Sequence, residues 1–189
     1  MNLAKSFFCL AILALVSFGG IVMAQESSTP KSAAEVVKAQ PYVSLDPVPR
    51  GKAFEAAVVV HIAEGYHMNS HKPSDTYLIP TTLTPRVPAG FRLVDTMYPP
   101  GSLKKFAFSP DKPLDVYSGS VTLRLKLMAE DTAAIGATTI PMTLRYQACN
   151  NSACLPPVKV PVTAALRVAA AGSAAKPVHP DIFAAPAHN

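Results

Sequence analysis

The chain has 189 residues, of which 49% are hydrophobic and 15% are charged, and its formal net charge is +5. Its 17 Lys and Arg residues are scattered along the sequence, which argues against a nucleic-acid-binding surface. A chain of this length is long enough for one domain with a hydrophobic core and too short for two comfortable ones. We therefore expect a single domain.

The N-terminus has the features of a secretory signal peptide. Lys5 precedes an apolar run over residues 7–16, and small or apolar residues precede a cleavage point after Ala24. Polar and glycine residues end the run early, whereas a membrane-spanning helix needs about 20 unbroken apolar residues. We predict a signal peptide over residues 1–24, export to the periplasm and no stable membrane insertion.

Both ends of the remaining chain lack a clear pattern. Residues 25–41 are rich in Ser, Ala, Gln and Lys, and residues 169–189 consist largely of Ala, Pro and His, so both are predicted to be flexible. Between them, prolines recur too often for a helix of more than a few turns. We expect residues 42–168 to form a domain rich in β-strands.

Alternating hydrophobicity predicts the strands of this domain. Over residues 121–127 every second residue is apolar, which is typical of a strand with one buried face. Short strands separated by Pro and Gly turns predict an all-β fold, an immunoglobulin-like antiparallel β-sandwich. Further strands are predicted in the alternating segments 140–146 and 158–163 and in the continuously apolar segment 54–62.

Two cysteines, Cys149 and Cys154, remain after the signal peptide and its Cys9 are removed. A bridge between them closes so short a loop that it adds only about 2 kcal/mol of stability, against about 3 kcal/mol for a fifteen-residue loop. The pair lies between two predicted strands, and an exposed pair at a hairpin tip suits thiol–disulfide exchange. A redox-active pair, a structural disulfide and a metal site all remain open at this point.

The metal alternative needs ligands besides two sulfurs. His61, His67 and His71, with Met68 nearby, are the candidates, and two cysteines with two histidines hold zinc or copper in other proteins. Nothing in the sequence brings these groups together. We therefore predict no metal site and no cofactor.

Several short segments, in a fixed order, resemble one known family. They are Gly65-Tyr66-His67-Met68-Asn69-Ser70, Lys72-Pro73, Leu78-Ile79-Pro80-Thr81, Tyr98-Pro99-Pro100, Lys105-Phe106, Leu114-Asp115-Val116-Tyr117-Ser118-Gly119, Tyr146-Gln147-Ala148-Cys149 and Cys154-Leu155-Pro156-Pro157. Together they resemble the N-terminal periplasmic domain of the thiol:disulfide interchange protein DsbD and its stand-alone relatives, over roughly residues 42–166.

The resemblance implies a protein-disulfide reductase type of electron-transfer domain, with a link to cytochrome c biogenesis. Such a domain takes electrons from a membrane-embedded carrier and passes them to periplasmic thioredoxin-like proteins. By position, Cys154 resembles the cysteine that forms the mixed disulfide with partners, and Cys149 the one that resolves it. No His or carboxylate is adjacent in sequence to activate either thiol. The rival interpretation is a non-catalytic immunoglobulin-like binding module with a structural disulfide.

Members of this family shield the cysteine pair with an aromatic cap loop. The matching stretch is residues 104–108, which makes Phe106 and Phe108 the cap candidates, with core packing as the alternative for both. Tyr146, Tyr117 and Pro156 are expected to frame the pair, although Tyr146 also falls on the buried side of its strand. The family protein continues into membrane helices and a thioredoxin-like domain, so we expect donor and acceptor here to be other polypeptides.

Overall fold

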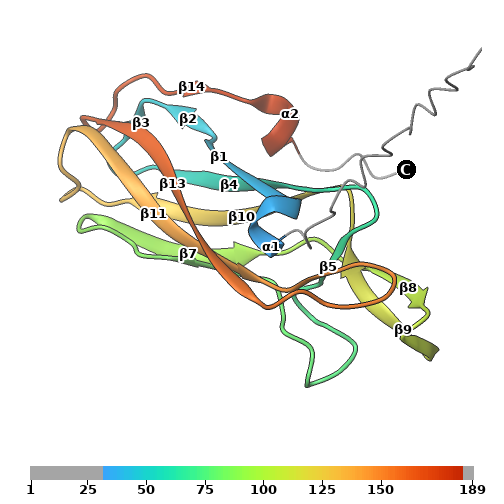
Figure 1. Ribbon diagram of the computed structural model, residues 1–189. Helices are drawn as coiled ribbons and strands as arrows, with labels where there is room; N and C mark the ends of the chain where they lie inside the picture. Colours follow the sequence, from blue (N-terminus) through green and yellow to red (C-terminus); the bar gives the residue numbers. More distant parts are fainter. Residues whose placement is uncertain (1–31, 185–189) are drawn as a thin grey trace, which may run out of the picture.

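The computed structural model describes residues 32–184, and this part of the chain consists mainly of β-strands (Figure 1). The helices are α1 (Ala33–Val36) and α2 (Pro180–Phe183). The strands are β1 (Val37–Val43), β2 (Leu45–Asp46), β3 (Val48–Pro49), β4 (Ala53–Ile62), β5 (His67–Asn69), β6 (Thr82–Pro85), β7 (Phe91–Met97), β8 (Ser102–Phe106), β9 (Ser109–Tyr117), β10 (Ser120–Ala129), β11 (Gly136–Tyr146), β12 (Ala148–Cys149), β13 (Val158–Ala169) and β14 (Lys176–Pro177).

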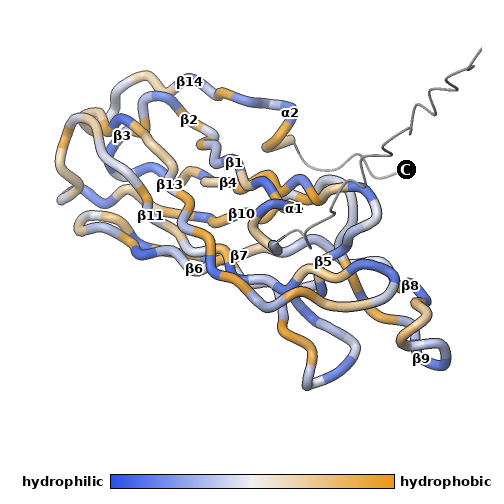
Figure 2. Tube along the Cα trace, in the orientation of Figure 1, coloured by the Kyte–Doolittle hydropathy of each residue, from blue (hydrophilic) through white to orange (hydrophobic). Residues whose placement is uncertain are grey.

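Two four-stranded sheets pack face to face. One has the order β1-β4-β10-β7 and the other β3-β13-β11-β6, and every pairing in them is antiparallel except that of β3 with β13. Hydrophobic and hydrophilic residues alternate along the strands (Figure 2), which gives each sheet one buried face. Leu123, Leu125 and Leu127 of β10 meet Ile140 and Leu144 of β11 in this core. The predicted all-β, immunoglobulin-like antiparallel sandwich is confirmed.

A third sheet, of order β12-β5-β9-β8, extends from one end of the sandwich. Figure 1 shows β8 and β9 projecting at the end opposite β3. One face of this sheet adds Met68 and Tyr117 to the main core, while residues on its other face help to form a small second cluster. The members of that cluster are Leu78, Phe106, Leu114 and Val116. This smaller sheet carries the first of the two cysteines, at Cys149.

Regular structure extends further toward both ends than the sequence predicts. Within the segment 25–41, α1 and most of β1 lie in the described residues, and the Tyr146 hydroxyl donates a hydrogen bond to the Ala33 carbonyl at 2.8 Å. Within 169–189, β14 pairs with β2, and Arg124 donates hydrogen bonds to the carbonyls of Ile182 and Ala184. Contacts with the sandwich, which composition does not reveal, hold these segments in place.

Two sequence-based expectations concern the N-terminus and the membrane. The predicted signal peptide, residues 1–24, lies outside the described residues. Within residues 32–184, no helix has both the length and the apolar character needed to cross a membrane.

Candidate functional site

Cys149 and Cys154 form a disulfide at the tip of the hairpin that connects β11 and β13. Their Cα atoms are 3.9 Å apart, on opposite arms of a four-residue turn. The Asn150 backbone N–H donates to the Ala153 carbonyl at 2.9 Å, and the Asn150 side-chain oxygen accepts from the N–H groups of Ser152 and Ala153 at 2.8 and 2.9 Å. The turn is therefore closed by hydrogen bonds of its own, independently of the disulfide.

The two cysteines differ sharply in exposure. Cys149 is 1% exposed, whereas Cys154 is an exposed residue, as are the turn residues Ser152 and Ala153. An attacking thiolate must approach a disulfide sulfur directly, so exposure decides which sulfur is attacked. The Cys154 side of the bridge is therefore the side that is open to solvent.

Cys149 lies directly opposite His67, because β12 pairs with β5 in that register. Opposed residues in an antiparallel pair project to the same face, with Cβ atoms about 5 Å apart. The His67 ring stacks on Phe106, with ring centres 3.9 Å apart, and Phe106 stacks on Phe108 at 5.4 Å. The three rings, called the aromatic stack below, extend from Phe108, in the turn between β8 and β9, to His67, opposite Cys149.

His67 is a neutral, buried ring within this stack. It is 3% exposed, and its Nε2 atom has no hydrogen-bond partner among the residues that the structure describes. Burial lowers the pKa of His67 to about 4, and the positive charge of Lys104 acts in the same direction. The imidazole is therefore uncharged at neutral pH.

The two cap candidates have different environments. Phe106 is 9% exposed and belongs to the small cluster under β8 and β9, so it takes part in both core packing and the aromatic stack. Phe108 is 40% exposed and forms the outer end of the stack, 6.4 Å from His67 between ring centres. Both rings are joined through His67 to the strand that pairs with Cys149.

The other expected framing residues are more dispersed. Tyr146 is fully buried in the main core, where burial raises its pKa to about 12. Tyr117 is paired with Met68, and its hydroxyl donates to the Pro99 carbonyl at 2.9 Å. Pro156 is exposed and follows Cys154 closely in the chain. Of these three residues, Pro156 lies on the accessible side of the disulfide.

A cavity of about 510 Å³ adjoins the aromatic stack. His67 and Phe106 line it together with Asn151 of the cysteine turn, and Lys104 and Lys105 of β8 contribute positive charge to its wall. The surroundings of the disulfide therefore combine an apolar stack with two cations.

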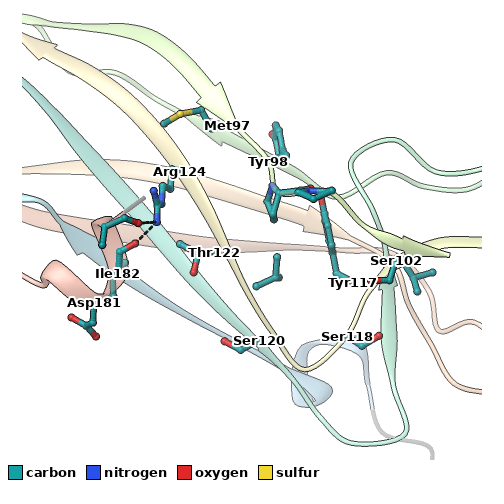
Figure 3. A pocket seen from close by; sticks show the side chains of 15 residues that line it. Met97, Tyr98, Ser102, Tyr117, Ser118, Ser120, Thr122, Arg124, Asp181 and Ile182 are labelled. Carbon is teal, nitrogen blue, oxygen red and sulfur yellow. Dashed lines mark hydrogen bonds between the residues drawn. The ribbon is translucent and has the colours of Figure 1, made fainter. Parts of the chain in front are cut away.

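A larger groove, of about 740 Å³, lies elsewhere on the molecule (Figure 3). Arg124 and Ile182 lie at one end of it, and Tyr98 and Tyr117 at the other. Neither residue of the disulfide lines this groove. It is a surface feature separate from the cysteine pair.

The histidines considered as metal ligands are not gathered around the sulfurs. His61 is exposed on β4, and His71 stacks on Tyr98 with ring centres 3.6 Å apart. In the described range 32–184, no group of three or more His, Cys, Asp or Glu residues is arranged to hold a metal ion. Of the three histidines, His67 is the one opposite a cysteine.

His67, a candidate metal ligand by its sequence context, is instead the neighbour of Cys149 across two paired strands. No His or carboxylate is adjacent to either cysteine in the sequence, so the sequence alone does not reveal this neighbour. The two residues meet because β5 pairs with β12, and a three-residue strand pairing with a two-residue strand has too little alternation to predict that contact. The Gly65-to-Ser70 segment was the available signal, since it is part of the family resemblance.

Comparison with known proteins gives one family match. The family model for the N-terminal region of thiol:disulfide interchange protein DsbD matches residues 33–165, which is most of the chain. The reduced N-terminal domain of DsbD from Neisseria meningitidis is 18% identical, with a TM-score of 0.42, and the match covers 76% of this chain and 90% of that one.

The N-terminal periplasmic domain of ScsB from Proteus mirabilis is 15% identical, with a TM-score of 0.45, over 68% of this chain and 46% of that one. No curated protein has significant sequence similarity to the chain. The family model covers both cysteines and the elements around them. The chain therefore belongs to the DsbD N-terminal family of thiol:disulfide interchange domains.

Proposed function

We propose that this protein performs thiol–disulfide exchange in the periplasm through Cys149 and Cys154. In this function it accepts electrons from a membrane-embedded carrier and passes them to thioredoxin-like proteins. The observation that carries the proposal is the unequal exposure of the two sulfurs, with Cys154 accessible and Cys149 buried beside the aromatic stack. A bridge across so short a loop stabilises the fold only a little. Exposure of one of its sulfurs adds nothing to that stabilisation.

The exchange has two steps in the electron-delivering direction. The Cys154 thiolate attacks a sulfur of the partner's disulfide, forming the mixed disulfide and releasing one partner thiolate, which takes up a proton. Cys149 then loses its proton and attacks the Cys154 sulfur, which restores the Cys149–Cys154 bridge and releases the second partner thiolate. Two electrons pass from the cysteine pair to the partner. The same two steps in reverse, with the electron donor as partner, reduce the pair again.

The aromatic stack supports this division of roles. It borders Cys149 and leaves Cys154 exposed, so that an incoming thiolate or disulfide meets the intended attacking residue first. Phe106 and Phe108 act here as the cap for the buried cysteine. Lys104 and Lys105 add positive charge on the same side, which favours a thiolate and an acidic partner surface.

Variants of the two cysteines test the proposal with a thioredoxin-like protein as partner. Cys149→Ala should accumulate a mixed disulfide through Cys154, and Cys154→Ala should form little or none, as measured by non-reducing electrophoresis and mass spectrometry. Equal trapping by both variants would show that the assigned roles are wrong.

Redox titration against glutathione buffers separates exchange from a structural bridge. A reduction potential above about −250 mV fits exchange with periplasmic carriers. A potential well below about −300 mV would instead mark the bridge as structural and favour the rival interpretation, a non-catalytic binding module.

A further inference from the structure

The unpartnered nitrogen of His67 is an unusual feature of the site. Buried polar atoms are nearly always hydrogen-bonded, and an exception calls for a physical explanation. A phenylalanine at this position would stack on Phe106 equally well and would bury no nitrogen lone pair. In the oxidised protein the Nε2 atom of His67 is a hydrogen-bond acceptor, or a donor in the other tautomer. No residue among those described is its partner.

Reduction of the disulfide creates the missing partner. In the oxidised state the Cys149 sulfur carries no hydrogen, and in the reduced state it becomes a thiol with an S–H donor. Cys149 is 1% exposed, so water has little access to that donor. His67 lies directly opposite on β5, so the two side chains project to the same face of the strand pair.

We propose that His67 accepts the hydrogen of the Cys149 thiol in the reduced protein and takes that proton when Cys149 attacks the mixed disulfide. This inference rests on the exchange function proposed above and assigns the base for its second step. The proton moves from Cys149 Sγ to the imidazole as the new S–S bond forms and the bond from Cys154 to the partner breaks. Because the ring is neutral in the oxidised protein at neutral pH, the imidazolium then releases the proton to solvent.

The surroundings of the ring suit this role. The low pKa of His67 keeps the ring neutral, so its lone pair is free to accept a hydrogen. Lys104 and Lys105, which line the adjoining cavity, stabilise the thiolate that remains after proton transfer, and Glu64 in the same lining balances part of their charge. The Asn69 side-chain oxygen is also buried without a hydrogen-bond partner among the described residues. Asn69 pairs with Val116, however, and not with Cys149.

His67→Phe tests the proposal because it keeps an aromatic ring in the stack and removes the nitrogen. The probe is 5,5′-dithiobis(2-nitrobenzoate) with fully reduced protein. Attack by Cys154 releases one coloured thiolate, and attack by Cys149 releases the second. The variant should keep the first phase and slow the second by about tenfold, less than the hundredfold or more contributed by a base whose pKa lies near the operating pH.

A second readout is the equilibrium between oxidised and reduced protein in glutathione buffers. Loss of a hydrogen bond to the reduced form should lower the equilibrium constant for reduction by about threefold to tenfold in His67→Phe. A tenfold decrease corresponds to about 30 mV toward a more negative potential. A role confined to packing predicts no such change.

His71→Phe is the matched control, because His71 is also stacked on an aromatic ring but is not opposite a cysteine. It should leave both phases and the potential unchanged. If the stability of His67→Phe is too low for the assay, His67→Gln, which keeps an acceptor, should retain a faster second phase than His67→Leu.

Unchanged second-phase rates in His67→Phe, or equal rates in the Gln and Leu variants, would overturn the role of His67 and leave the proposed function intact. Failure of the wild-type protein to give a first phase would contradict the proposed function itself. The two failures are therefore distinguishable.

Discussion

His67 shows how a single residue links the aromatic stack to the cysteine pair. Its backbone is paired with Cys149, and its ring is stacked on Phe106. Burial makes protonation unfavourable, so the folded protein binds a proton at His67 much less readily than the unfolded chain does. The stability of the domain should therefore depend on pH through this residue.

We expect the oxidised protein to lose stability as the pH falls from about 6.5 toward about 4, since the unfolded chain takes up a proton at His67 before the folded protein does. This contribution to the free energy of unfolding is fully present above the pKa of His67 in the unfolded chain, about 6.5. It amounts to about 3 kcal/mol across this window. Urea denaturation of wild type and His67→Phe at several pH values measures it. Parallel stability curves for the two proteins would contradict the assigned pKa shift.

The β8–β9 hairpin is the element that presents the two proposed cap residues, Phe106 and Phe108. Phe106 is fixed in the small cluster with Leu114 and Val116, whereas Phe108 is half exposed and packs mainly on the ring of Phe106. We therefore expect Phe106 to contribute mainly to the stability of the hairpin and Phe108 to the shielding of Cys149.

Phe108→Ala should accelerate alkylation of the reduced Cys149 by iodoacetamide several-fold, and should leave the rate at Cys154 unchanged. The change in the free energy of unfolding should stay below about 1 kcal/mol, because the side chain is already partly exposed. Phe106→Ala, in contrast, should cost about 3 kcal/mol, as is typical of a buried phenylalanine. Mass spectrometry of tryptic peptides gives the alkylation rates, and equal Cys149 rates in wild type and Phe108→Ala would exclude shielding by Phe108.

On the scale of the whole molecule, a segment near each end of the described residues is hydrogen-bonded to the sandwich. The N-terminal one is fastened by the bond from Tyr146 to Ala33, and the C-terminal one by the bonds from Arg124 to Ile182 and Ala184. The C-terminal segment borders the larger groove, which is separate from the disulfide. The stability of this C-terminal segment and the reduction potential of the cysteine pair should therefore vary independently.

Arg124→Ala should destabilise the C-terminal segment by about 1–3 kcal/mol, the range for a hydrogen bond from a charged group. Hydrogen–deuterium exchange over residues 176–184 should rise, while the reduction potential of the cysteine pair stays at the wild-type value. A shifted potential would show that the two regions are coupled.

The sequence predicted the main sheets well and the site only in part. Alternating hydrophobicity marks β10, β11 and β13, because a strand with one buried face shows its period in its own residues. The pairing of His67 with Cys149 joins two very short strands that are distant in the chain, and no local pattern encodes it. The structured parts of 25–41 and 169–189 were missed for a similar reason, since they depend on contacts with the sandwich and not on their own composition.

The hydrogen bonds of the Asn150 turn have a consequence for the reduced protein. Cleaving the S–S bond leaves these bonds in place, so the two arms of the hairpin do not separate. The Cys149 thiol consequently remains at a high effective concentration relative to Cys154, whether Cys154 is free or joined to a partner. A mixed disulfide would then be short-lived, and the protein could cycle through many turnovers without any refolding of its hairpin.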